Sequence, residues 1–108
     1  MVDIMYNKLV RDLIPAIITD DNQTPVTHIL NDDEFRKALL EKLVEEAKEL
    51  LESDGDLGER ADIAEVLQAL DDVLGYSKDE IENARLKKAD KRGGFEQKIF
   101  LEKAITHD

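Results

Sequence analysis

Cysteine is absent from the sequence, and only two histidines occur, His28 and His107. Without cysteine the chain can form neither disulfides nor thiolate metal sites, which fits a reducing cytoplasm. The two histidines lack the close spacing of a metal-ligand pair, so we expect neither to bind a metal. The chain also has no apolar run long enough for a signal peptide or for a helix that crosses a bilayer. We therefore expect a cytoplasmic protein without a membrane partner.

Acidic residues far outnumber basic ones. The 108 residues include 26 Asp and Glu against 15 Lys and Arg, which gives a formal net charge of −11. Such a charge repels the phosphate backbone of DNA and RNA, so a nucleic-acid polymer is not expected as a partner. Hydrophobic residues make up 42% of the chain, which is enough for a core. The length allows one small domain, and we expect residues 1–108 to form it.

Helix signals dominate the chain. Asn31 with Glu34, and Ser77 with Glu80, have the spacing of capping boxes, in which each side chain bonds the backbone N–H of the other residue. A polar turn at residues 54–56 separates two long segments with helical apolar spacing. Short turns favour antiparallel neighbours, so we expect a mainly α fold, an antiparallel helical bundle. The expected helices cover residues 33–53, 57–74 and 78–91, preceded by a short helix that is capped by Asp12 and carries Pro15 in its first turn.

Two segments favour strands instead. Residues 26–30 are rich in β-branched side chains and alternate in polarity, and residues 98–103 follow the glycine pair Gly93-Gly94. A strand needs a partner for its backbone N–H and C=O groups. These segments therefore predict a short two-stranded β ribbon that joins the two ends of the chain.

Four carboxylates have the spacing to meet across the turn at residue 54. Glu49 and Glu59 each lie five residues from the centre of the turn, and Glu46 and Asp62 each lie eight residues from it. In an antiparallel helix pair, residues equally far from the turn lie at the same level. The spacing therefore predicts two opposed carboxylate pairs about one helical turn apart.

Helical rotation also favours this meeting. On the first helix, Lys42, Glu45 and the two glutamates of the opposed pairs fall within an arc of about 100°. On the second helix, Glu59 falls among the apolar positions and Asp62 at their edge. Both acidic residues thus occupy positions where a helix normally carries core side chains.

Carboxylates gathered between two helices repel one another and lose hydration, so a positive charge must compensate. A hard divalent cation with oxygen ligands suits such a site, and we expect Mg²⁺, with Mn²⁺ as the alternative ion. The plainer interpretation is a solvated acidic helix face, which is the common origin of acidic residues at this spacing. The sequence alone leaves both interpretations open.

Spacing argues against two other metal sites. A calcium loop that starts at Asp54 needs glycine at its sixth position, where Glu59 stands. A bundle with a di-iron centre needs Glu-x-x-His on two helices, and the sequence has no such pair.

Basic residues near both ends of the chain are candidates for phosphate contacts. Lys8 and Arg11 lie three positions apart, and Lys91 and Arg92 precede the two glycines at the end of a predicted helix. The plainer interpretations are a solvated N-terminal segment and an ordinary helix end whose dipole favours cations. With Lys42 beside the acidic residues, the predicted phosphate contacts are Lys8, Arg11, Lys42, Lys91 and Arg92.

The acidic motifs resemble a family signature. Residues 45–49 read Glu-Glu-x-x-Glu and residues 59–62 read Glu-x-x-Asp, similar to the all-α nucleoside triphosphate pyrophosphohydrolases, the superfamily of MazG, dimeric dUTPases and phosphoribosyl-ATP pyrophosphohydrolase. Residues 6–12 and 91–95 resemble the two ends of a short MazG-like branch regarded as house-cleaning enzymes for noncanonical nucleotides. One departure is the spacing, because only the nine residues 50–58 separate the acidic halves, fewer than the family usually shows.

This resemblance implies Mg²⁺-dependent hydrolysis between the α and β phosphates of a nucleoside triphosphate, with a monophosphate and pyrophosphate as products. It implies that Glu45 orients or deprotonates the attacking water, and that the chain assembles as a homodimer or homotetramer. The metal ligands implied by the motif are Glu46, Glu49, Glu59 and Asp62.

Two alternative functions remain open at this point. Phosphoribosyl-ATP pyrophosphohydrolases share the acidic motif, although the two end segments resemble them less. A non-catalytic helical module, whose acidic face docks onto a basic partner, has the same composition.

Overall fold

The computed structural model describes residues 1–107. Within these residues the chain is all-helical, as predicted, and divides into two units, the first covering Met1–Gly75 and the second beginning at Tyr76. None of the helices in this part of the chain is long and apolar enough to cross a membrane. The helices are α1 (Ile14–Asp20), α2 (Asp32–Glu52), α3 (Leu57–Leu74) and α4 (Lys78–Arg92).

Both predicted capping boxes are present. At the start of α2, the Glu34 backbone N–H donates to Asn31 Oδ1 at 2.9 Å and the Asn31 N–H donates to the Glu34 carboxylate at 3.2 Å. Ser77 and Glu80 form the same arrangement at the start of α4. The predicted cap of the first helix is wrong, because the chain enters α1 one residue later, at Leu13, with Pro15 in the first turn as expected.

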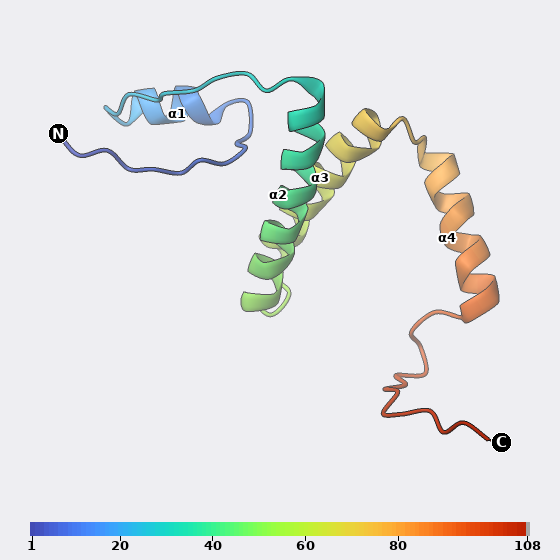
Figure 1. Ribbon diagram of the computed structural model, residues 1–108. Helices are drawn as coiled ribbons and strands as arrows, with labels where there is room; N and C mark the ends of the chain where they lie inside the picture. Colours follow the sequence, from blue (N-terminus) through green and yellow to red (C-terminus); the bar gives the residue numbers. More distant parts are fainter. Residues whose placement is uncertain (108) are drawn as a thin grey trace. The chain divides into compact units, whose positions relative to one another are not determined.

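The hairpin of α2 and α3 is the central feature of the first unit. Figure 1 shows the two helices side by side, and they run in opposite directions from a four-residue turn. Gly55 has a φ of 94°, a conformation that side chains with a Cβ rarely adopt, and its N–H donates to the Leu50 carbonyl at 3.0 Å. Asp56 then caps α3, and its carboxylate accepts the N–H groups of Gly58 and Glu59 at 3.0 and 3.3 Å.

The core of the hairpin is small. Its buried apolar side chains are Leu39 of α2 with Val66 and Leu70 of α3. The N-terminal segment contributes Leu9, which packs against this cluster and ties the segment to the hairpin. Partly buried side chains around the same cluster are Phe35, Leu43 and Ala69.

A second apolar stripe on α2 faces solvent. The stripe contains Leu40, Val44 and Leu51, which are 47%, 56% and 80% exposed, and Ala47 between them is exposed as well. These residues lie one position further along the chain than the core-facing positions. The apolar periodicity of α2 therefore covers two faces, and α3 buries only one of them.

The predicted β ribbon is not formed. Neither residues 26–30 nor residues 98–103 are strands, and the side chains of Val26 and Ile29 are 96% and 95% exposed. Alternation and β-branching favour a strand only where a neighbouring strand accepts its hydrogen bonds, and an isolated two-stranded ribbon is marginally stable. Local pattern was therefore a poor guide for these segments.

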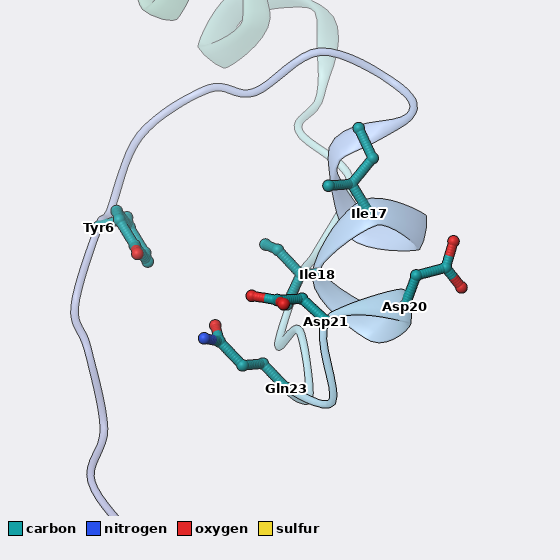
Figure 2. Close-up of a pocket in the computed structure, with 6 residues that line it drawn as sticks. All are labelled: Tyr6, Ile17, Ile18, Asp20, Asp21 and Gln23. Atoms are coloured by element: carbon teal, nitrogen blue, oxygen red, sulfur yellow. The ribbon is translucent and has the colours of Figure 1, made fainter.

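A hollow of about 490 Å³ lies between the N-terminal segment and α1. Figure 2 shows Tyr6 on the extended segment, opposite the end of α1 and the turn that follows it. The hollow is lined by Tyr6, Ile17, Ile18, Asp20, Asp21 and Gln23.

Candidate metal centre

Four carboxylates converge between α2 and α3. Glu46 and Glu49 of α2 and Glu59 and Asp62 of α3 each offer an oxygen, and these oxygens all lie within 4.8 Å of one another. Counting from the turn predicts the same four residues at two matched levels. The structure thus brings together all the carboxylates expected to meet, despite the short connection between the acidic halves.

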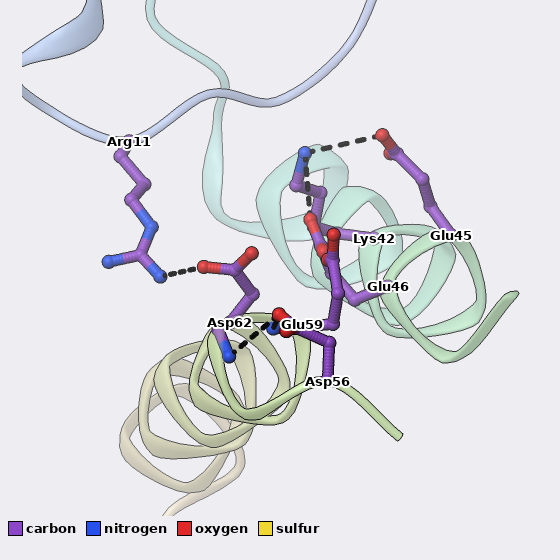
Figure 3. A network of polar contacts seen from close by, with 8 residues as sticks. Arg11, Lys42, Glu45, Glu46, Asp56, Glu59 and Asp62 are labelled. Atoms are coloured by element: carbon purple, nitrogen blue, oxygen red, sulfur yellow. Dashed lines mark hydrogen bonds and ion pairs between the residues drawn. The ribbon is translucent and has the colours of Figure 1, made fainter. Parts of the chain in front are cut away.

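The start of α3 is built to hold Glu59 in place. Asp56 anchors the first turn of α3 by accepting the Glu59 N–H, as the dashed lines in Figure 3 show. Gly58 permits this close approach, because a Cβ at that position would lie only 3.0 Å from the capping oxygen of Asp56. The cap therefore fixes the backbone of a candidate ligand, and the neighbouring glycine allows it.

Glu46 is the buried member of the cluster. The residue is only 6% exposed, and one of its two oxygens, Oε2, is buried without a hydrogen-bond partner. The Oε2 atom of Glu59 is in the same state. Buried carboxylate oxygens without donors are costly, so two of them on residues of one cluster favour a cation as their missing partner.

Burial raises the pKa of the Glu46 carboxyl, and the nearby Glu49 carboxylate raises it further. The ammonium group of Lys42 opposes this rise. Burial is the largest of these effects, so the carboxyl of Glu46 is harder to ionise in the folded, metal-free protein than in water.

Three cations contact the acidic residues. Lys42 forms ion pairs with Glu46 at 3.4 Å and with Glu45 at 3.5 Å, both visible in Figure 3. The N-terminal segment supplies the other two: Lys8 donates to Glu45 at 3.4 Å, and Arg11 donates to Asp62 at 2.7 Å.

These contacts leave an excess of negative charge. Glu45 and the four clustered carboxylates carry five formal negative charges, and the cations that contact them carry three positive ones. Among residues 1–107, no ion pair is formed by Glu49 or Glu59. The remaining excess of two negative charges equals the charge of one divalent cation.

The other predicted site residues lie in different surroundings. Glu45 is beside the cluster but not part of it, because its carboxylate is held by Lys8 and Lys42. Lys91 and Arg92 belong to the second unit, where they occupy the last turn of α4. Their assignment as phosphate contacts stays a prediction.

Sequence reasoning missed the contact between Arg11 and Asp62 and the cap formed by Asp56. Asp is among the residues preferred directly before a helix, and Asp56 precedes the predicted helix 57–74, so the cap could have been predicted from the sequence. The contact between Arg11 and Asp62 joins residues 51 positions apart, and no local pattern predicts such a contact. The hollow beside α1 was missed for the same reason.

Comparisons with known proteins identify no family for this chain. A search against models of protein families found no match, and no solved structure matches the chain. The chain is 49% identical over 47 residues to a protein of Mycolicibacterium smegmatis described as uncharacterized, a match that covers 44% of this chain and 48% of that protein. The chain therefore matches about half the length of this relative.

Proposed function

We propose that the protein is a Mg²⁺-dependent nucleoside triphosphate pyrophosphohydrolase that cleaves between the α and β phosphates. The observation that carries this proposal is the convergence of four carboxylates within 4.8 Å, with two buried oxygens lacking donors. The excess of two negative charges at the site agrees with the binding of a divalent cation. The acidic motifs, which resemble those of all-α pyrophosphohydrolases, supply the link to this reaction.

The four clustered residues fit Mg²⁺, with Mn²⁺ as the alternative, because every donor is a carboxylate oxygen and hard divalent ions prefer oxygen. Glu46, Glu49, Glu59 and Asp62 would hold the ion. When bound, it would supply positive charge that screens the phosphates and makes water a better nucleophile.

The protein's own residues would perform the remaining roles. In the reaction, water adds across the α–β phosphoanhydride, which yields a monophosphate and pyrophosphate and releases a proton. Glu45 would accept this proton, and its position next to the cluster without belonging to it supports this role. Lys42 contacts both Glu45 and Glu46 and would keep a positive charge beside the reacting phosphates.

When substrate binds, Arg11 and Lys8 would leave their carboxylate partners and contact the phosphates instead. Their ion pairs with Asp62 and Glu45 join partly exposed side chains, and such pairs contribute only about 0–1 kcal/mol. A cation and a triphosphate that arrive together can therefore replace these pairs at little cost. Lys91 and Arg92 are the further candidates for phosphate contact.

The direct test is pyrophosphate release from nucleoside triphosphates with Mg²⁺, comparing the unmodified protein with Glu49→Gln and Asp62→Asn. Loss of one ligand charge should lower kcat by roughly 100-fold or more, an effect of the size seen when a preorganised electrostatic contact is removed. Glu65→Gln, an exposed position on α3 outside the cluster, is the matched control and should keep full activity.

Folded Glu49→Gln protein with unchanged activity would refute the ligand assignment. A screen of canonical and damaged triphosphates would identify the substrate, which we propose to be a noncanonical nucleotide removed by a cytoplasmic house-cleaning enzyme. Preferential cleavage of phosphoribosyl-ATP would favour that alternative instead. Absence of any Mg²⁺-dependent nucleotide binding would favour a non-catalytic acidic docking module.

A further inference from the structure

We propose that the hollow between the N-terminal segment and α1 binds the nucleoside part of the substrate, with Tyr6 stacking on the base. This inference rests on the proposed function, because it assumes that the triphosphate lies at the carboxylate cluster. It adds a binding site for the other half of the same molecule.

The size and lining of the hollow fit a nucleoside. Its volume is about 490 Å³, within the range of about 300–1,000 Å³ typical of small-molecule sites. Tyr6 offers an aromatic ring, and Ile17 and Ile18 add apolar surface. Stacking on an aromatic side chain is the common way in which proteins hold a base without reading its sequence.

The charge of the lining excludes phosphate and favours hydrogen-bond donors. Asp20 and Asp21 line the hollow, and none of its lining residues is basic. Figure 2 shows Asp21, Gln23 and Ile18 on the side of α1 and its turn that faces Tyr6. Carboxylate and amide oxygens there can accept hydrogen bonds from base N–H groups or ribose hydroxyls.

A chain of contacts connects the hollow with the carboxylate cluster. The Nζ atom of Lys8 lies 6.0 Å from the centre of the Tyr6 ring and 3.4 Å from a carboxylate oxygen of Glu45. Lys42 links Glu45 to Glu46 in turn. The side chains of Lys8, Glu45 and Lys42 therefore form a continuous path from the Tyr6 ring to the carboxylate cluster.

The test measures the binding of two probes to the Glu45→Gln protein, which should cleave neither of them: α,β-methylene-ATP and inorganic tripolyphosphate, each with Mg²⁺. The nucleotide should bind at least about fivefold more tightly than tripolyphosphate, since base stacking contributes about 1–3 kcal/mol. Tyr6→Ala should remove this advantage without changing tripolyphosphate affinity, and Tyr6→Phe should keep it.

Tyr76→Ala is the matched control, because Tyr76 is 54% exposed, close to the 61% of Tyr6, and does not line the hollow. It should leave both affinities unchanged. An undiminished nucleotide advantage in Tyr6→Ala would overturn the proposal. An equal loss of affinity for both probes would overturn the proposal too, because Tyr6 would then act only by positioning Lys8.

The failure of the proposed function would look different. In that case neither Mg²⁺–tripolyphosphate nor Mg²⁺ alone would bind. Adenosine would still bind the hollow if the nucleoside site exists, and Tyr6→Ala would remove that binding.

Discussion

At the scale of single residues, Glu46 is a carboxylate whose buried surroundings disfavour its negative charge. It is 6% exposed, one carboxylate oxygen pairs with Lys42, and the other has no partner. A buried charge whose partners do not fully compensate it is strongly unfavourable. A residue that destabilises the metal-free fold in this way is most readily explained by a ligand that it binds.

The raised pKa of Glu46 predicts an unusual pH dependence of stability. Above its ordinary value of 4.5, the unfolded chain has released this proton while the folded protein still holds it. The folded state then binds more protons, so the free energy of unfolding falls as the pH rises through the raised folded pKa. We expect Glu46→Gln, which cannot titrate, to show a smaller fall.

Urea unfolding of both proteins in EDTA, from about pH 4.5 to 7.5, measures this difference. Other acidic residues titrate in both proteins, so their contribution cancels in the comparison. Equal pH slopes for the two proteins would mean that the Glu46 carboxyl keeps its ordinary pKa in the folded state.

The sequence predicts that the four carboxylates lie together, but it does not predict all of their partners. Glu46 and Asp62 were matched by counting from a turn, because a helix hairpin converts equal sequence distance into equal level. Lys8 and Arg11 reach the same site from 37 and 51 residues away. Their placement depends on the path of an irregular segment, which carries no periodicity to predict it.

At the scale of secondary structure, the α2–α3 hairpin places the candidate ligands. The helices were predictable, since capping boxes and a polar turn are local signals that the structure satisfies locally. The β ribbon was not, because a strand depends on a partner elsewhere in the chain. The same contrast separates the predictable positions of the four carboxylates from the hollow beside α1, which no local pattern predicts.

Because the core is small, we expect that one cavity in it markedly lowers the free energy of unfolding of the hairpin. Leu70 is 4% exposed and packs with Leu39 and Val66. Leu70→Ala should lower the free energy of unfolding by about 2–5 kcal/mol, the usual cost of removing a buried leucine side chain. Chemical denaturation monitored by circular dichroism measures this loss.

Leu57→Ala is the control for this prediction, because Leu57 is an 82% exposed leucine on the same helix. Its effect should stay within about 0.5 kcal/mol. Similar losses at both positions would indicate that α3 is not held by the cluster around Leu70.

At the scale of the whole molecule, the exposed stripe on α2 predicts self-association. Leu40, Val44 and Leu51 present apolar surface at helical spacing, and small domains often gain core by forming symmetric oligomers. We expect a homodimer or homotetramer at micromolar concentration. Val44→Asp should shift it toward monomer, because the substitution puts a charge in the stripe.

Sedimentation equilibrium measures the oligomeric state of the unmodified protein and of Val44→Asp. The matched variant Ile29→Asp adds the same charge at a 95% exposed residue outside the stripe and should leave the assembly intact. A purely monomeric unmodified protein would contradict the prediction, as would an unchanged assembly in Val44→Asp.

The central claim is that the four clustered carboxylates bind a divalent cation, and calorimetric titration of the metal-free protein with Mg²⁺ or Mn²⁺ tests it most directly. We predict saturable binding that Glu59→Gln weakens at least about tenfold, as expected for the loss of a charged ligand. Glu65→Gln, with the same charge change on α3 but outside the cluster, should bind like the unmodified protein. Equal, non-saturating binding by all three proteins would contradict the account.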